Sequence, residues 1–230
     1  MSSASPVHRP NTPTAHRRRV VIGLAAAPLA MSIGDALAQG GTDITLPPAQ
    51  TEGGMPLMQA LKARRTSRTF ASQELTSQTL SDLLWAAFGI NRADGHRTAP
   101  SARNWQEIDI YVATDTGAWV YDAKAHALHR VLKDDVRSFA GTQGHARVAP
   151  VTLVYVADTR RMAGASDATR IEYAAADAGF IAQNAYLYCA SEGLATVVFA
   201  SIDRERLAQA LKLDPAQRIV LAQSVGHRAR

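Results

Sequence analysis

The sequence lacks the signatures of several common enzyme and metal sites. Its single cysteine, Cys189, excludes an internal disulfide in a chain of 230 residues. It contains no Cys-x-x-Cys or His-Glu-x-x-His pattern and its seven histidines are scattered, so we predict no metal site. Gly-x-Gly-x-x-Gly and Walker patterns are missing, which argues against a Rossmann or P-loop nucleotide site. No serine lies in a Gly-x-Ser-x-Gly elbow, so hydrolase chemistry has little support.

Net charge is also too low to indicate a nucleic-acid binder. The formal charge is +5, and the first 38 residues hold four arginines against Asp35 alone, a net of +3, which leaves +2 for the rest. Nucleic-acid binding normally needs a stronger basic patch with interleaved aromatic residues. The hydrophobic content of 47% is enough for the core of one domain. We therefore expect no nucleic-acid partner.

The first 38 residues resemble a bacterial export signal. Arg17-Arg18-Arg19 precede an uncharged apolar stretch over residues 20–31, and Ala36-Leu37-Ala38 offers a small-x-small cleavage site. Consecutive arginines before a modestly hydrophobic stretch are typical of the twin-arginine route, with the general secretory route as the competitor. We predict an export signal over 1–38 leading to the periplasm, a flexible linker over 39–54 and one domain over 55–230.

The pattern of the remaining chain predicts an α+β fold. Apolar residues at helical spacing and capping residues predict helices, and alternating or continuous apolar runs predict strands. The predicted helices cover 55–62, 77–88, 134–139, 169–191 and 203–211, and the predicted strands cover 108–113, 119–122, 127–132, 151–156, 196–199 and 219–225. These elements do not follow a regular βαβ rhythm, so a doubly wound sheet is disfavoured.

The long helix over 169–191 is rich in alanine and glycine on several sides. Small side chains let other backbones approach closely, so it is either the core helix of a monomer or a helix shared by a core and a subunit interface. Small residues all round favour the interface. Glu172, Asp177 and Glu192 argue against a membrane span, and we predict none in the mature chain.

Three polar segments are candidates for a binding site. Residues 64–68 (Arg-Arg-Thr-Ser-Arg), called the basic segment below, bring three guanidinium groups together; such groups bind phosphate, although a solvated helix end is the competing interpretation. The second segment runs over 97–105 and contains Pro-Ser-Ala-Arg-Asn-Trp at 100–105, called the 100–105 loop below. The third is the C-terminal stretch over 226–230.

At these segments the chain resembles the FMN-dependent nitroreductase family. Residues 64–70 resemble its Arg-Arg-Ser-x-Arg-x-Phe motif and residues 100–105 its Pro-Ser-Ser/Ala-x-Asn loop, and Gln143 and the long helix follow in the same order. The resemblance implies a three-layer fold with a mixed, mainly antiparallel sheet between helices. It also implies FMN as the cofactor and a homodimer, with the long helix at the interface and two sites built from both subunits.

The resemblance further implies roles for individual residues. Arg64 would bind the phosphate, Arg65 and Thr66 the phosphate–ribityl end, and Arg68 would lie near the flavin ring. The 100–105 loop would reach the flavin from the partner subunit. The full set of implied cofactor-binding residues is Arg64, Arg65, Thr66, Arg68, Pro100, Ser101, Ala102, Asn104, Gln143, Val198, Phe199, Ala200, Ser201, Arg228 and Arg230.

Two segments depart from the family pattern. Residues 198–201 (Val-Phe-Ala-Ser) stand where many members have Pro-Ile-Glu-Gly, and Gly226-His227-Arg228 replaces Gly-Tyr-Pro. The first departure affects the expected ring contact, and the second affects the register of the terminal arginines.

The function that follows is an FMN-dependent oxidoreductase. Hydride would pass through the flavin by a ping-pong reaction between a small-molecule donor and acceptor such as a nitro or quinone compound, with no dedicated acid or base. A periplasmic enzyme would not meet NAD(P)H, so another donor or an oxidative role, as in peptide azoline dehydrogenases, is an alternative. A non-catalytic flavin-binding or redox-sensing module is the other.

Overall fold

The structure, a computed structural model, describes residues 43–229 of the chain. The predicted export signal, the first four residues of the predicted linker and Arg230 lie outside the described residues. The helices and strands are β1 (Asp43–Thr45), α2 (Leu57–Ala63), α3 (Ser77–Phe88), β2 (Ile108–Thr114), β3 (Gly117–Asp122), β4 (Ala127–Leu132), α4 (Arg137–Ala140), α5 (Gly144–Val148), β5 (Val151–Asp158), α6 (Asp167–Ser191), β6 (Ala195–Phe199), α7 (Arg204–Ala210) and β7 (Gln217–Gly226).

One seven-stranded sheet forms the middle of the molecule. Its strand order is β1-β4-β3-β2-β5-β7-β6, and each pairing within the described residues is antiparallel. All eight residues of β5 are buried, because this strand lies between β2 and β7 and is covered on both faces. A continuous apolar run is what such a position requires, and the prediction of a central strand there is confirmed.

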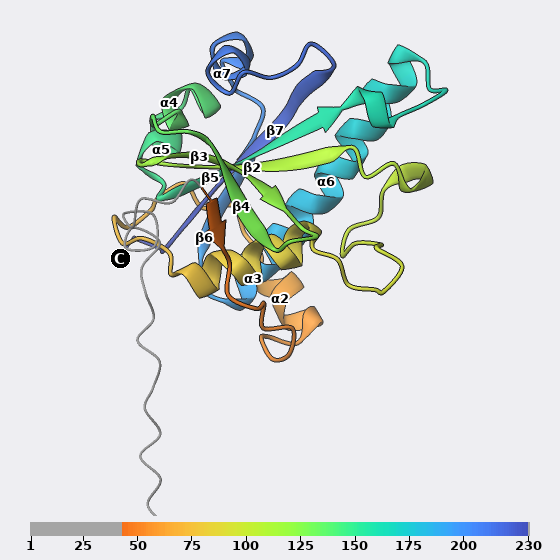
Figure 1. Cartoon of the computed structure of the whole chain (residues 1–230). Helices are drawn as coiled ribbons and strands as arrows, with labels where there is room; N and C mark the ends of the chain where they lie inside the picture. The colour runs from red at the N-terminus through yellow and green to blue at the C-terminus, as the bar shows by residue number, and fades with distance from the viewer. Residues whose placement is uncertain (1–42, 230) are drawn as a thin grey trace, which may run out of the picture.

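Helices cover both faces of the sheet, which gives three layers (Figure 1). Side chains of α3 and α6 form one core with the sheet, and side chains around α4, α5 and α7 form the second core on the opposite face. The predicted α+β fold with a sheet between two layers of helices is confirmed. Within residues 43–229, none of the helices combines the length and apolar character that crossing a bilayer requires.

Capping residues set the helix boundaries as the sequence predicts. The hydroxyl of Thr76 accepts from the amide of Thr79 at the start of α3, and Gly89 ends that helix. Asp203 caps α7 in the same way. The long helix α6 begins two residues earlier than predicted, because the hydroxyl of Ser166 accepts from the amide of Thr169 and starts the helix at Asp167.

The part of the predicted linker that the structure describes is built into the domain. Asp43–Thr45 forms the edge strand β1 on β4, and Leu46 is buried in the core. The hydroxyl of Ser81 donates to the carbonyl of Pro47 at 2.6 Å. The expectation of a flexible segment is therefore wrong from residue 43 onward, since an apolar residue and a sheet edge hold this stretch in place.

A buried polar chain ties β6 to the centre of the sheet. The hydroxyl of Tyr155 donates to Oε1 of Gln223 at 2.6 Å, and Nε2 of Gln223 donates to Oγ1 of Thr196 at 3.0 Å. Thr196 in turn donates to the carbonyl of Ser224 at 2.8 Å. Because every member is satisfied, this network fixes the position of β6, whose C-terminal end belongs to the candidate site.

Candidate functional site

The basic segment lies where α2 ends and runs beside β6. Arg64 is the C-terminal cap of α2, and the amide of Ser67 donates to the carbonyl of Thr196 in β6 at 2.9 Å. The guanidinium of Arg64 lies over the ring of Tyr186 at 5.3 Å, within the usual range of a cation–π contact. Arg65 and Arg68 are exposed. The segment is thus fixed by its backbone while its cations face outward.

Tyr186 of α6 connects the basic segment to the end of β6. Its side chain is buried, and its hydroxyl accepts from the amide of Val198 at 3.0 Å. The same hydroxyl lies 3.0 Å from Oγ1 of Thr66 and is free to donate to it. Tyr186 was not among the residues predicted from the sequence, because a tyrosine at a buried helical position looks like an ordinary core residue.

The C-terminal stretch returns to the same place. Phe70 forms a β-bridge with Arg228, and the amide of Ala71 donates to the carbonyl of His227 at 2.9 Å. The backbone of Gly226 packs so closely that an added Cβ would lie 2.5 Å from the ring of Pro150. The backbone of Arg228 therefore lies opposite Phe70, just after the basic segment, and its Nε atom donates to the carbonyl of Leu194 at 3.3 Å. The predicted contact of Arg230 falls outside the described residues.

The segment 198–201, at the C-terminal end of β6, lies beside the residues around Gln143. The amide of Thr142 donates to the carbonyl of Ser201 at 3.0 Å, and Gln143 follows directly as the N-terminal cap of α5. The rings of Phe199 and His145 are in edge contact at 5.5 Å. Burial, with a smaller effect of the positive charge of Arg68, lowers the pKa of His145. Helix α5 was not predicted, because five residues give too short a pattern to recognise.

The 100–105 loop lies elsewhere on the chain, against α6. The amide of Ala102 donates to Oδ2 of Asp177 at 3.0 Å. Asp177 precedes Tyr186 by nine residues, which corresponds to about 13 Å along a helix. Within one chain, the loop and the basic segment are therefore held at different parts of α6. Among residues 43–229, the structure groups the other predicted residues around β6 and leaves Pro100, Ser101, Ala102 and Asn104 apart from them.

Exposed apolar side chains lie on α2 and α6. Large apolar side chains with at least two fifths of their surface exposed are Leu57, Met58 and Leu61 on α2, and Ile171, Tyr173 and Phe180 on α6. Gly179 has no neighbouring atom within 4 Å of an added Cβ. Exposed large apolar side chains gathered on two helices commonly mark a protein–protein contact.

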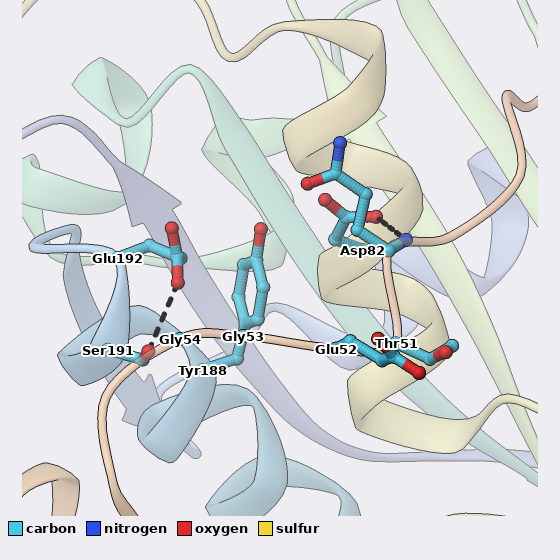
Figure 2. Close-up of a pocket in the computed structure, with 9 residues that line it drawn as sticks. Thr51, Glu52, Gly53, Gly54, Asp82, Tyr188, Ser191 and Glu192 are labelled. Atoms are coloured by element: carbon cyan, nitrogen blue, oxygen red, sulfur yellow. Dashed lines mark hydrogen bonds between the residues drawn. The ribbon is translucent and has the colours of Figure 1, made fainter. Parts of the chain in front are cut away.

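A separate acidic cavity of about 190 Å³ lies at the C-terminal end of α6. Figure 2 shows Glu52, Asp82, Tyr188 and Glu192 around it. Asp82 already accepts from the amide of Gln50 at 2.7 Å, and Ser191 donates to Glu192 at 3.1 Å. Among residues 43–229, no three His, Cys, Asp or Glu side chains are arranged to hold a metal. Asp82 therefore ties Gln50 to α3, and the hydroxyl of Ser191 ties the following residue, Met55, to α6 by accepting from its amide at 2.7 Å.

The family model described as "Nitroreductase family" matches residues 61–227, and the chain belongs to that family. It is similar to a crystal structure from Ralstonia eutropha JMP134 that carries a provisional nitroreductase name. The two are 40% identical with a TM-score of 0.80, over 89% of this chain and 97% of that one.

Two other relatives are more distant. A Methanocaldococcus jannaschii protein, also provisionally named a nitroreductase, is 29% identical over 68% of this chain and 84% of its own length. The NADPH:FMN oxidoreductase from Vibrio harveyi, solved with NAD+, is 22% identical with a TM-score of 0.58, over 76% of this chain and 69% of that one. This last likeness is one of fold.

Proposed function

We propose that the chain is an FMN-dependent oxidoreductase that works as a homodimer. The observation that carries this is the convergence of cations without carboxylate partners. Arg64, Arg65 and Arg68 lie within five residues of one another and, like Arg228, take part in none of the ion pairs found among residues 43–229. Unpaired guanidinium groups held by backbone contacts suit a phosphate dianion.

The residues around β6 fit the remaining parts of FMN. The hydroxyl of Thr66, oriented by Tyr186, is placed beside Arg64 to bond phosphate or ribityl oxygens. Arg68 and the 198–201 segment supply a cation and a partly apolar surface for the ring. When bound, FMN supplies the two-electron chemistry, and a nearby cation favours negative charge on the reduced ring. The chain's own role is to bind, orient and shield, so it needs no dedicated acid or base.

The second subunit enters the proposal because one chain holds two separated parts of the site. The 100–105 loop and the basic segment are attached to different parts of α6, and exposed apolar side chains lie on α2 and α6. A dimer through these side chains would bury them and bring the loop of one subunit to the basic segment of the other. Each dimer would then hold two FMN molecules.

The electron donor and acceptor follow from the proposed location. We propose export to the periplasm by the twin-arginine route, which carries folded, cofactor-loaded proteins. NAD(P)H is not available there, so a different donor would reduce the flavin before a nitro, quinone or other organic acceptor is reduced in a second half-reaction. Dehydrogenation of peptide azolines is the corresponding oxidative reaction.

The proposal is tested by reconstituting the purified chain with FMN and recording its absorbance. We expect a bound flavin spectrum, and we expect Arg64→Ala to weaken FMN binding by about 10- to 100-fold, the usual cost of a charge-assisted contact. Arg206→Ala is the matched control, since Arg206 lies on α7 and pairs with Asp203. A colourless chain that takes up no FMN would overturn the proposal.

Catalysis is separated from simple binding by a second measurement. Anaerobic mixing of the flavin-loaded protein with candidate donors, then with nitro, quinone and azoline compounds, should bleach and restore the flavin spectrum. Bleaching by dithionite with no response to any organic donor or acceptor would favour a non-catalytic flavin-binding module.

A further inference from the structure

A fully buried carboxyl group lies beneath the 100–105 loop. Glu107 immediately precedes β2, and no part of its side chain is exposed. Its Oε2 atom accepts from the hydroxyl of Ser101 at 3.2 Å. Its Oε1 atom is buried and has no hydrogen-bond partner. A buried carboxylate oxygen without a donor is costly, so this arrangement requires an explanation.

A second buried acid on α6 faces Glu107 and can accept a hydrogen bond from it if Glu107 carries a proton. Asp177 is only 2% exposed, faces Glu107, and uses Oδ2 to accept from the amide of Ala102. Burial, with the negative charge of Asp177, raises the pKa of Glu107. One proton on Oε1 of Glu107 can be donated to Asp177. That proton gives the orphaned oxygen a partner and leaves a single negative charge, which the amide of Ala102 helps to stabilise.

Other charged groups near Glu107 do not replace this proton. Asp109 is paired with Arg161 at 2.9 Å, and Asp158 lies 3.8 Å from the same guanidinium. Asp158 meets Glu107 only through the backbone, where its amide donates to the Glu107 carbonyl at 2.8 Å. Arg97 is engaged within the loop region, where it donates to the side chain of Gln106 at 2.7 Å.

The loop above the two acids has an unfavourable backbone conformation. Arg103, Asn104 and Gln106 have φ angles of 52°, 54° and 48°, a region that residues other than glycine and asparagine rarely adopt. The amide of Gln106 donates to Oγ of Ser101 at 2.8 Å, and Ser101 donates in turn to Glu107. Ala102 at the start of this turn thus bonds to Asp177, and Gln106 at its end is linked to Glu107 through Ser101.

We propose that Glu107 and Asp177 form a buried acid pair bridged by one proton, and that this acid pair holds the 100–105 loop in the shape the flavin site uses. Both are positioning residues, because they act on the loop and do not themselves reach the site. The relevance to flavin rests on the proposed function. The effect of the acid pair on the loop does not depend on the proposed function.

The loop carries its own reporter, Trp105. Its ring is in edge contact with Tyr173 at 5.9 Å, so its fluorescence reports movement of the loop relative to α6. The experiment is a pH titration of the full chain up to about pH 9, below the ordinary tyrosine pKa of about 10. Subtracting the signal of the Trp105→Phe variant removes the contribution of the other two tryptophans.

Two substitutions at Glu107 separate the proton from the side chain. Glu107→Gln keeps a donor toward Asp177 and an acceptor for Ser101 but cannot ionise. We expect the Trp105 fluorescence of the wild-type chain to change as the pH rises, and we expect Glu107→Gln to lose this change. Glu107→Ala removes both contacts, and we expect amide exchange over residues 101–106 to accelerate by at least about tenfold. Glu205→Gln, at an exposed site on α7, should match the wild-type chain in both measurements.

Two results would overturn the proposal. One is a Glu107→Gln variant that keeps the wild-type pH transition, since the proton would then not lie on Glu107. The other is unchanged loop exchange in Glu107→Ala, or in Asp177→Ala if the first variant does not fold. For flavin, we expect Glu107→Ala to weaken FMN binding by at least about tenfold. If no variant and not even the wild-type chain binds FMN, the proposed function fails, while fluorescence and exchange still decide for or against the acid pair.

Discussion

The hydroxyl of Tyr186 accepts from the backbone amide of Val198 at 3.0 Å. It lies at the same distance from Oγ1 of Thr66. One buried side chain on α6 therefore sets the relative position of the basic segment and the end of β6. This contact makes the packing of a core helix part of the candidate flavin site.

Replacing Tyr186 by phenylalanine should affect both stability and binding. The variant leaves the amide of Val198 without an acceptor, and we expect the free energy of unfolding to fall by about 1–3 kcal/mol. FMN binding should weaken as well, because Thr66 loses its fixed orientation. Urea unfolding and FMN titration measure the two effects. Tyr188→Phe, on the same helix, is the matched control, since the hydroxyl of Tyr188 makes only a long contact of 3.4 Å with the carbonyl of Thr79; equal behaviour of the two variants would contradict the role of Tyr186.

The apolar surface of α2 and α6 should be a subunit interface. Phe180 on α6 is 48% exposed, and Phe180→Glu would place a charge where the partner packs. We expect this variant to sediment as a monomer and to lose FMN, with the dimer dissociation constant raised at least about a hundredfold. Gln209→Glu, on the exposed face of α7, should leave the dimer intact. A Phe180→Glu dimer with full flavin content would show that the interface lies elsewhere.

His126 should make the domain less stable in acid. Burial lowers the pKa of His126. Its Nε2 atom lies 2.7 Å from Oγ of Ser81, which already donates to Pro47, so Nε2 carries the proton and Nδ1 accepts from Tyr121. Below about pH 6.5 the unfolded chain takes up a proton that the folded chain resists, and stability falls as pH decreases toward the folded pKa. Above about pH 6.5 this contribution is fully present.

Urea unfolding between about pH 7.5 and pH 5 measures the effect. The comparison that isolates His126 is with His126→Gln, which cannot titrate in this range and should show a flatter dependence on pH. His129 has to be kept in both chains, because its exposed pair with Asp43 raises its pKa and changes stability in the opposite direction. Identical pH dependence of the two chains would refute the assignment.

Cys189 should be unreactive in the folded protein. Its thiol is fully buried on α6, and burial raises its pKa to about 12. The thiolate is the reactive form, so a thiol reagent should modify the native chain far more slowly than the urea-unfolded chain. Modification of the native protein at the rate of a free thiol would contradict the structure.

Local sequence signals were sufficient for much of the fold. The capping hydroxyl of Thr76 and the terminal Gly89 predicted α3 with its observed bounds, and the apolar run from Val151 predicted β5. They failed where an element depends on distant partners. β1 exists because β4 offers an unpaired edge, and α5 spans only five residues, so neither has a pattern of its own.

The candidate site, like the fold, could be predicted from the sequence only in part. The basic segment and the 100–105 loop could be found from sequence, because unusual residue types are concentrated in a few positions. Tyr186, Glu107 and Asp177 could not, because their roles arise from contacts across 12 to 120 residues of chain. A buried tyrosine or carboxylate looks ordinary until its partner is known.

In the proposed dimer, each flavin site combines the basic segment of one subunit with the 100–105 loop of the other. Arg64→Ala impairs the first part, and Asn104→Asp impairs the second while tolerating the left-handed backbone at that position. Each variant alone should bind FMN weakly. Mixed dimers, formed by unfolding and refolding the two variants together, should contain one intact site and one doubly impaired site.

The decisive measurement is therefore the FMN content of purified mixed dimers carrying different affinity tags. We predict tight binding of one FMN per mixed dimer, half the content of the wild-type dimer. Mixed dimers that bind FMN no better than the two parent variants would contradict the account, because both parts of each site would then come from the same chain.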